Sequence, residues 1–303
     1  MTTIRQLEYI AAIEKFGTFQ AAADACHVTQ PGLSAQVRQL EESLCVEIFE
    51  RGRKPVLVTA AGREILRHAH RVLSAKNELH HAALGLNQTL TGRLRLGVIP
   101  TVAPFLIPRI LPTVRRRYPK LRLELREEQT HQLVEALEKG ELDVLLVALE
   151  APLGNVTKVS ILDDRFLLAV PRGHRLAKRK RVRDSDLTEE SVLLLEDGHC
   201  LRNQALSICS RAGVTEFGDF RATSLTTLIS MVASGVGVTL LPSLAMQDNV
   251  LVDEDLVLVP FGRPFPKRTI GLVWRKTSSR KGDYAELASI FRESAIASAG
   301  RRG

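Results

Sequence analysis

The sequence changes its pattern near residues 89–92, and this change limits the folds that the chain can adopt. Before it, apolar residues recur at helical spacing. From Leu94 onward, short apolar runs typical of strands alternate with helical segments. Such alternation predicts an α/β region with largely parallel sheets. The stretch of about 210 residues is long enough for two lobes, with ligand chemistry in the cleft between them.

The expected strands of this region are 94–98, 121–126, 144–148, 166–170, 192–195, 238–241, 256–259 and 270–274. The expected helices between them include 107–117, 131–139 and 225–234.

Composition limits the class of protein. The chain has 303 residues, of which 45% are hydrophobic, as in globular proteins. It has no apolar run of the roughly eighteen residues that a membrane span needs, and its first residues lack the apolar core of a signal peptide. We therefore expect no membrane partner and a cytoplasmic location. Four cysteines are too few for a disulfide scaffold in a chain of this size.

The formal net charge of +8 favours a polyanionic partner, but its distribution weakens that argument. Through residue 58 there are six Lys/Arg against seven Asp/Glu. The excess lies at residues 115–117, 175–183 and 301–302, where it is most simply solvated surface. A prediction of DNA binding therefore has to come from the residue pattern and not from the charge.

Residues 4–58 predict short helices, two of which form a helix-turn-helix pattern. Thr18 can cap the first of the two and Thr29 the second, which carries Pro31 in its first turn. The second helix has one apolar stripe, formed by Leu33, Val37, Leu40 and Leu44. The first turns of such a helix meet base edges in the major groove. Its candidate DNA-binding residues are Thr29, Gln30, Pro31, Ser34 and Arg38. Amphipathic helices also occur in ordinary cores, so the pattern alone leaves that alternative open.

A wing and a long helix are expected next. Residues 51–59 predict two short strands with a basic tip, which adds Arg51 and Arg53 to the candidate DNA-binding residues. Thr59 can cap a helix that runs to about residue 86. Its apolar side comprises Leu66, Ala69, Val72, Leu73, Leu79, Ala83 and Leu86. A helix of about 25 residues spans about 38 Å and cannot bury that side alone, so we expect it to pair with its copy in a dimer.

Two cysteines, Cys200 and Cys209, follow an acidic, glycine-containing turn at residues 196–198. On a helix that begins near His199, nine residues give about 900° of rotation and about 13 Å of rise, so the sulfurs lie on opposite faces. A disulfide needs Cα atoms within about 7 Å, so joining the two cysteines requires the helix to unwind. This predicts a redox switch. The alternative is that both thiols only fill space, as free cysteines often do.

The N-terminal pattern resembles LysR-type transcriptional regulators. The motifs that carry the resemblance are Gly17-Thr18-Phe19, Ala21-Ala22-Ala23, Thr29-Gln30-Pro31, Leu33-Ser34, Ile48-Phe49-Glu50-Arg51 and Thr59-Ala60-Ala61-Gly62. Two positions depart from it: Cys26 stands where the family usually has leucine, and Cys45 where it usually has glycine. Cys45 is therefore expected in a strained left-handed conformation. We assign both thiols to packing.

The C-terminal region resembles the peroxide-sensing OxyR branch of that family. The motifs are Gly97-Val98-Ile99-Pro100-Thr101, Gln129-Thr130-His131-Gln132-Leu133, Glu196-Asp197-Gly198-His199-Cys200-Leu201-Arg202, Arg221-Ala222-Thr223-Ser224-Leu225 and Arg268-Thr269-Ile270-Gly271-Leu272-Val273. Two features depart from the branch: Asn203 stands where aspartate is frequent, and the loop 172–183 is unusually basic.

The resemblance implies the roles of the site residues. Cys200 is the sensing thiolate that peroxide oxidises to a sulfenic acid, and Cys209 resolves it as a disulfide. Thr101, Thr130 and His199 orient the peroxide, and Arg268 lies close to the reacting atoms. On the residues alone, the alternatives are a capping or packing role for His199, local backbone bonding for both threonines, and a surface position for Arg202.

The resemblance also implies partners and an architecture. The partners are double-stranded promoter DNA, hydrogen peroxide, RNA polymerase, further copies in a dimer of dimers, and a thiol reductant such as a glutaredoxin or thioredoxin. No cofactor and no metal are implied. The expected fold is an all-α winged helix-turn-helix at residues 1–58, a linker and dimerisation helix at 59–90, and a two-lobed α/β regulatory domain of the periplasmic-binding-protein type at 91–303. Lobe I takes about 91–163 and 268–303, and lobe II about 164–267.

Three other functions remain possible for such a sequence. One is a LysR-type regulator that answers a small metabolite in the cleft between the lobes. Another is a thiol peroxidase, against which the helix-turn-helix pattern and the lack of a thioredoxin-like pattern count. The third is a periplasmic solute receptor, which the lack of an export signal disfavours. We expect a regulator and not an enzyme.

Overall fold

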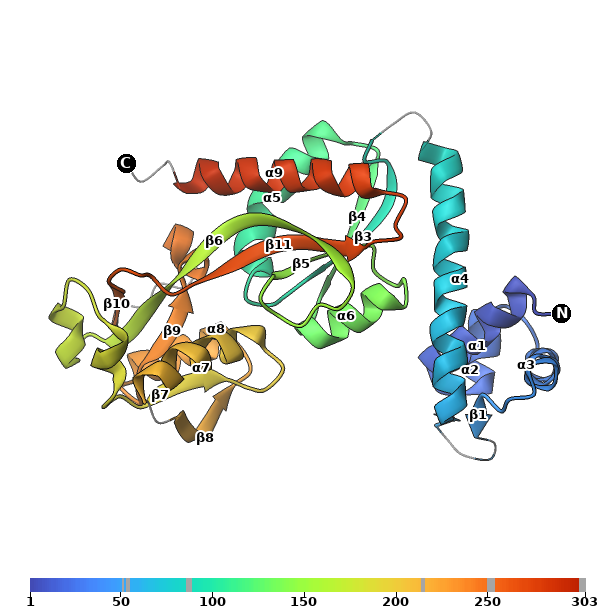
Figure 1. Cartoon of the computed structure of the whole chain (residues 1–303), viewed down its shortest axis with the longest axis horizontal. Helices are drawn as coiled ribbons and strands as arrows, with labels where there is room; N and C mark the ends of the chain where they lie inside the picture. The colour runs from blue at the N-terminus through green and yellow to red at the C-terminus, as the bar shows by residue number, and fades with distance from the viewer. Residues whose placement is uncertain (51, 53–54, 86–88, 214–215, 250–253, 300–303) are drawn as a thin grey trace. The chain divides into compact units, whose positions relative to one another are not determined.

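A computed structural model of the chain describes residues 1–50, 52, 55–85, 89–213, 216–249 and 254–299 (Figure 1). The chain divides into two compact units, Met1–Asn87 with Ala136–Leu142 and Gln88–Glu135 with Asp143–Gly303. Arg51 and Arg53, predicted at the wing tip, and Leu86, predicted at the end of the long helix, lie outside the described residues.

The first unit contains the expected helix-turn-helix and wing. Its elements are α1 (Ile4–Phe16), α2 (Phe19–Ala25), α3 (Gln30–Leu44), β1 (Phe49–Glu50), β2 (Leu57–Val58) and α4 (Ala60–Gly85). The three predicted caps are confirmed, because the hydroxyls of Thr18, Thr29 and Thr59 accept hydrogen bonds from backbone N–H groups at 3.1, 3.3 and 2.8 Å. β1 pairs antiparallel with β2 and begins two residues before the predicted wing, at Phe49.

The apolar stripe of α3 faces the core of this unit. Leu33, Val37 and Leu40 are buried and Leu44 is partly buried against them. Cys45 ends α3 with φ 53° and ψ 38°, the left-handed conformation that was predicted. Its assignment to packing is wrong, because its side chain is exposed. Cys26 is half-buried against the core, as expected of a packing residue.

The second unit alternates strands and helices, as predicted. Its elements are β3 (Gly92–Val98), α5 (Ala103–Arg117), β4 (Leu121–Glu127), α6 (Thr130–Glu138), β5 (Val144–Ala148), β6 (Val156–Pro171), η1 (Arg175–Lys178), η2 (Asp184–Leu187), β7 (Val192–Leu195), α7 (Cys200–Ala212), β8 (Glu216–Ala222), α8 (Leu225–Ala233), β9 (Thr239–Pro242), η3 (Ser243–Asn249), β10 (Leu256–Pro260), β11 (Lys267–Arg275) and α9 (Lys281–Ala299). Each predicted strand overlaps an observed one, and β8 is additional.

The sheets are mixed, so the prediction of largely parallel sheets is wrong. One sheet has the order β10-β6-β11-β5-β3-β4, with β9 also on β6, and β7 pairs with β8. β3 is parallel to β4 and β5, and β7 to β8, whereas β6 is antiparallel to β9, β10 and β11. The cause is the length of β6, whose first part pairs with β11 and whose last part pairs with β9 and β10. Figure 1 shows β6 and β11 side by side through this unit.

Burial follows this topology. All five residues of β5, which lies between β11 and β3, and all four residues of β7 and of β9 are buried, so these strands belong to the core of the unit. α5 and α9 pack against each other next to the sheet (Figure 1). None of the helices in the described part of the chain combines the length and the apolar composition that a bilayer crossing requires.

Candidate functional site

A backbone turn at Gly198 comes directly before α7 and determines where the helix begins. Gly198 has φ +97°, a backbone conformation that favours glycine, and a Cβ atom there would lie 2.1 Å from Oε1 of Gln129, so any larger residue would also displace the end of that side chain. His199 follows in an extended conformation as the N-cap, and Cys200 is the first helical residue. The predicted helix start near His199 is confirmed. Cys200 therefore stands where backbone N–H groups point away from the helix.

Arg202 anchors this turn to the strand before it. Its guanidinium donates to the carbonyl of Leu195 at 3.2 Å and pairs with Asp197 at 2.9 Å. Asp197 also pairs with Arg221, at 2.6 Å. Arg202 is 6% exposed, so its reading as a surface helix residue is wrong. These bonds hold the start of α7 against the end of β7.

Both cysteines lie on the same unbroken helix. Cys200 is half-buried and Cys209 is buried, and both are reduced. With nine residues of helix between them, their Cα atoms are about 13 Å apart along the axis, beyond the reach of a disulfide. A bond between these sulfurs would require this part of α7 to unwind.

Thr101 and Arg268 form a buried pair. Nη1 of Arg268 donates to the Thr101 hydroxyl at 2.8 Å, and Nη2 donates to the Thr101 carbonyl at 3.1 Å. Nε of Arg268 donates to Asp164 at 3.0 Å, and both of these charged side chains are fully buried. Asp164 also accepts from Ser243 Oγ at 3.0 Å and from the N–H of Leu244 at 2.9 Å.

The bond from Arg268 determines how the Thr101 hydroxyl can act. A guanidinium can only donate, so the Thr101 oxygen is the acceptor of this bond. Its own proton remains available for a second partner. Thr101 can therefore donate to an oxygen or a thiolate while Arg268 holds it in place.

Thr130 offers a second buried hydroxyl. Within the described residues, its Oγ1 is buried and has no hydrogen-bond partner, which is rare for a buried polar atom. Thr130 begins α6, and the preceding Gln129 donates to Glu196 at 3.4 Å and abuts Gly198. The start of α6 therefore lies against the turn that precedes Cys200.

Burial favours the neutral form of His199. Burial lowers the pKa of His199 below its ordinary value, and the carboxylate of Glu196, 3.8 Å from its Nε2, opposes that shift. A neutral imidazole has one nitrogen that accepts a proton and one that donates. His199 is 7% exposed and can serve either as a packing residue or as a proton acceptor beside Cys200.

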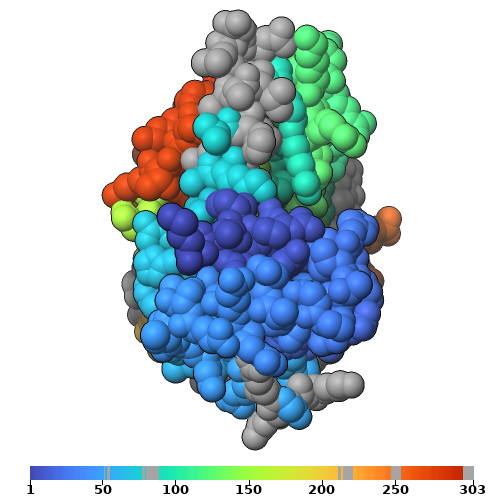
Figure 2. Space-filling view, turned by 90° about the vertical axis from the view of Figure 1, so that its right-hand side faces the viewer, coloured from blue at the N-terminus to red at the C-terminus, as the bar shows by residue number. Residues whose placement is uncertain are grey.

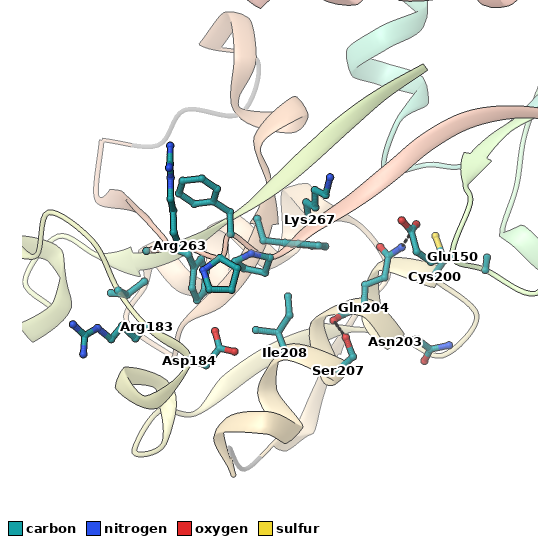
Figure 3. A pocket seen from close by; sticks show the side chains of 18 of the residues that line it. Glu150, Arg183, Asp184, Cys200, Asn203, Gln204, Ser207, Ile208, Arg263 and Lys267 are labelled. Atoms are coloured by element: carbon teal, nitrogen blue, oxygen red, sulfur yellow. Dashed lines mark hydrogen bonds between the residues drawn. The ribbon is translucent and has the colours of Figure 1, made fainter. Parts of the chain in front are cut away.

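Cys200 borders an open cavity of about 940 Å³ (Figure 3). The α7 side chains Asn203, Gln204 and Ser207 line it together with Glu150, and Arg183, Asp184, Arg263 and Lys267 lie farther along its wall. Gln204 donates to Glu150 at 3.5 Å. The cavity gives a small solute a path to the Cys200 thiol.

The structure brings the predicted site residues together in two groups. Thr101 and Arg268 are bonded to each other, and His199 and Cys200 are neighbours at the start of α7. Within the described residues, neither Thr101, Thr130 nor Arg268 hydrogen-bonds to the Cys200 thiol. The described His, Cys, Asp and Glu side chains nowhere gather in a set of three that could hold a metal ion.

Sequence reasoning missed two residues of this region. Asp164 holds Arg268, but in the sequence it is one acidic residue in the run Asp163-Asp164, and only the antiparallel register of β6 with β11 reveals its partner. Gln129 was part of a motif, but its contact with Gly198 depends on the fold. The glycine at 198 in the turn before Cys200 was the available signal for such a close approach.

The candidate DNA-binding residues gather at the start of α3. Thr29, Pro31 and Arg38 are exposed, and Gln30 and Ser34 are half-buried. Figure 2 looks onto the surface of the first unit, where α1 to α3 form a continuous blue face. Gln6 of α1 is buried and donates to the backbone and side chain of Gln36 at 3.4 and 3.3 Å, which fixes α3 against α1.

Comparisons with known proteins identify a family for the N-terminal part of the chain and another for the C-terminal part. Residues 4–63 match the family "Bacterial regulatory helix-turn-helix protein, lysR family", and residues 87–295 match the family "LysR substrate binding domain". The chain is 44% identical over 290 residues to the hydrogen peroxide-inducible genes activator of Dickeya chrysanthemi, covering 96% of this chain and 95% of that protein.

Two further relatives bear the name OxyR. The chain is 44% identical over 289 residues to the DNA-binding transcriptional dual regulator OxyR of Escherichia coli, covering 95% of this chain and 94% of the relative. A full-length OxyR variant from Pseudomonas aeruginosa superposes with a TM-score of 0.80 at 33% identity, covering 96% and 98% of the two chains. This chain therefore belongs to the LysR family of DNA-binding transcriptional regulators and, within that family, to its OxyR branch.

Proposed function

We propose that this chain is a transcriptional regulator that senses hydrogen peroxide through Cys200 and controls genes of oxidative-stress defence. One observation carries the proposal: Cys200 is the first residue of α7 and borders an open cavity, while Cys209 is buried on the same helix. The relatives named for induction by hydrogen peroxide support it.

The first step is oxidation of Cys200. Its thiolate attacks one oxygen of hydrogen peroxide, an S–O bond forms, and the O–O bond breaks. The leaving hydroxide takes up a proton and departs as water, which leaves a sulfenic acid on Cys200. The Thr101 hydroxyl donates a hydrogen bond to the peroxide, Thr130 supplies a second hydroxyl, and His199 accepts or returns a proton. Arg268 holds Thr101, and in this proposal its positive charge stabilises the reacting atoms.

The second step joins the two cysteines. The sulfur of Cys209 attacks the sulfur of the sulfenic acid, the S–S bond forms, and the S–O bond breaks with loss of water. Because the helix between them must unwind, α7 loses its anchors at Arg202 and Gln204. The regulatory lobes repack, and the DNA-binding units change their spacing on the promoter. A thiol reductant such as a glutaredoxin or thioredoxin returns both cysteines to thiols.

The architecture proposed for this function keeps the domain boundaries that the sequence predicts. Residues 1–58 bind DNA through Thr29, Gln30, Pro31, Ser34, Arg38, Arg51 and Arg53, residues 59–90 pair the subunits, and residues 91–303 form the sensor. Its two lobes, 91–163 with 268–303 and 164–267, have the periplasmic-binding-protein type of fold, a name that carries no information about location. The proposed assembly is a cytoplasmic dimer of dimers that acts on RNA polymerase.

Disulfide mapping after treatment with stoichiometric hydrogen peroxide tests the proposal. Peptide mass spectrometry is expected to find a Cys200–Cys209 bond within seconds, and DNA binding by the Cys200→Ser variant is expected to persist without a peroxide response. The Cys209→Ser variant is the matched control, which stops at a sulfenic acid that dimedone traps.

Other results would select other functions. A Cys200 that stays a thiol under peroxide would reject the sensor mechanism and turn attention to a metabolite in the cavity. Continuous consumption of peroxide with a reductant, far beyond one equivalent, would instead indicate a thiol peroxidase.

A further inference from the structure

Four consecutive exposed cations, Lys178, Arg179, Lys180 and Arg181, run from the last residue of η1 into the segment before η2 and are here named the basic turn. Buried residues anchor it on both sides, since Leu176 is 1% exposed and Val182 is fully buried. The N–H of Arg179 donates to the Leu176 carbonyl at 3.0 Å, and the N–H of Val182 donates to the Pro260 carbonyl at 3.0 Å. The turn is therefore a fixed feature of the second unit, beside β10 (Figure 1).

The charges of the basic turn are not neutralised by the fold. Within the described residues, none of its four side chains forms an ion pair. The carboxylates nearby serve other groups: Glu190 pairs with Arg175 at 2.7 Å and with His174 at 3.1 Å, and Glu189 lies 3.7 Å from Arg175. Four like charges on adjacent exposed residues repel one another, so the arrangement favours a polyanion.

Further cations continue the surface from the basic turn. The Val182 carbonyl accepts from the N–H of Gly262 at 2.8 Å, which places Arg183 beside Arg263. Both arginines line the cavity of Figure 3, where they are labelled at the end away from Cys200. The guanidiniums of Arg263 and Arg165 both lie over the ring of Phe265, at 5.8 and 4.5 Å. The aromatic ring thus adds one more exposed cation, Arg165, next to this surface.

Duplex DNA is the polyanion that this surface fits. Residues 172–183 contain no Phe, Tyr or Trp on which unpaired bases could stack, and the ring of Phe265 is already in contact with the guanidiniums of Arg165 and Arg263, so the surface favours a duplex over single-stranded nucleic acid. Four extended residues span about 13 Å, and a duplex carries one phosphate charge per about 1.7 Å of its axis. The first 58 residues hold six Lys/Arg against seven Asp/Glu, so the DNA-binding unit itself brings no surplus of positive charge.

We propose that the basic turn is a second DNA-binding surface, which contacts the phosphate backbone of duplex DNA without reading its sequence. The helix-turn-helix would select the site, and the basic turn would add affinity and hold DNA that flanks it. This inference rests on the DNA-binding role of the family and is independent of peroxide sensing.

Salt dependence of DNA binding by the full-length protein tests the inference. The test variant is Lys178→Gln, Arg179→Gln, Lys180→Gln and Arg181→Gln together. The matched control removes the same charge from exposed cations elsewhere in the second unit, through Arg115→Gln, Arg116→Gln, Lys276→Gln and Lys281→Gln. Fluorescence anisotropy with a long duplex of random sequence gives the binding constant between about 50 and about 200 mM salt.

Each phosphate contact contributes about 0.9 to the slope of log K against log salt concentration. The basic-turn variant is expected to lose about 2 to 4 of that slope per protomer and to bind at least about tenfold more weakly at the low-salt end. The control variant should keep the wild-type slope. Equal slopes for wild type and the basic-turn variant, or an equal loss in the control, would overturn the proposal.

Two additional measurements separate the remaining outcomes. Normal DNA binding with a loss of transcription activation would identify an acidic protein surface as the partner and reject DNA. Formation of the Cys200–Cys209 disulfide under peroxide reports that the variant is folded. If the wild-type protein forms no Cys200–Cys209 disulfide under peroxide, the sensor mechanism is contradicted. The salt test of the basic turn remains valid in that case, because it does not depend on the cysteines.

Discussion

The ion pair of Arg268 with Asp164 is the residue-level feature on which the site depends most. Both side chains are fully buried, and Asp164 offsets the charge that Arg268 brings into the interior. Removing one member of a buried pair leaves an uncompensated charge, which costs about 3–5 kcal/mol. Asp164→Asn is therefore expected to lower the stability of the second unit by about that amount, seen as a lower urea midpoint of its unfolding transition.

The neighbouring Asp163 supplies the control for this prediction. It pairs with Lys267 at 2.5 Å, but both side chains are about half exposed, and surface pairs contribute about 0–1 kcal/mol. Asp163→Asn should therefore leave the midpoint almost unchanged. An equal effect of the two substitutions would show that the Asp164–Arg268 pair has no special role in stability.

His199 makes stability depend on pH. Burial lowers the pKa of His199 below its ordinary value of 6.5, so the folded chain binds fewer protons than the unfolded chain when the pH lies below that value. The contribution of neutral His199 is fully present above pH 6.5 and is lost as the pH falls toward the lowered pKa. Urea midpoints measured from pH 7.5 down to pH 5 should fall more steeply for wild type than for His199→Gln. Parallel curves would contradict the prediction.

At the level of the element, α7 has to be stable when reduced and unwound when oxidised. Ser207 and Ser210 are exposed on this helix, and their hydroxyls bond to carbonyls three residues earlier, at 2.7 and 3.3 Å. Serine is a weaker helix former than alanine by about 0.5 kcal/mol. Ser207→Ala with Ser210→Ala should therefore stabilise α7 by about 1 kcal/mol in total, which slows Cys200–Cys209 bonding about fivefold.

Rapid quenching with an alkylating reagent measures that rate. Trapping by dimedone should show unchanged formation of the sulfenic acid, because oxidation of Cys200 precedes the unwinding. The paired variant Ser207→Gly with Ser210→Gly should accelerate disulfide formation, since glycine weakens the helix. If both pairs of substitutions leave the rate unchanged, unwinding of α7 does not limit the second step.

The local elements were largely predictable, because their signals are local. Thr18, Thr29 and Thr59 cap the helices that follow them, and the stripe of Leu33, Val37 and Leu40 faces the core. The full length of β6 and the existence of β8 were not predictable in this way. Residues 156–165 mix exposed, partly buried and buried positions without a regular alternation, on a strand that is stabilised by β11, more than 100 residues later in the sequence.

For the whole molecule, the sequence identifies the residues of the site but not their connections. The resemblance to a known family pointed to Thr101 and Arg268, but their direct bond and the role of Asp164 depend on strands that are distant in sequence. Arg202 illustrates the same limit. Helical position alone placed it at the surface, whereas the fold buries it against Leu195 and Asp197.

Exposed apolar side chains on α4 indicate how two copies of the chain pair. Val72 and Leu79 of α4 are 43% and 70% exposed, and seven residues of helix bring them to nearly the same face. Side chains of this size on one face favour pairing of α4 with its copy. Replacing Leu79 by serine removes roughly 2 kcal/mol of burial from each subunit of a symmetric dimer. The dimer dissociation constant of Leu79→Ser should therefore rise on the order of a hundredfold or more.

Sedimentation equilibrium over a range of concentrations measures this constant. Val72→Ser should act in the same direction, whereas Arg71→Ser changes an exposed residue about a quarter of a turn away and should leave the constant unchanged. If the dimer dissociation constant of all three variants equals that of the wild type, the dimer contact lies elsewhere on the chain. A selective loss with Leu79→Ser would locate it on the exposed face of α4, beyond the part of this helix whose Leu66 and Ala69 pack in the core of the first unit.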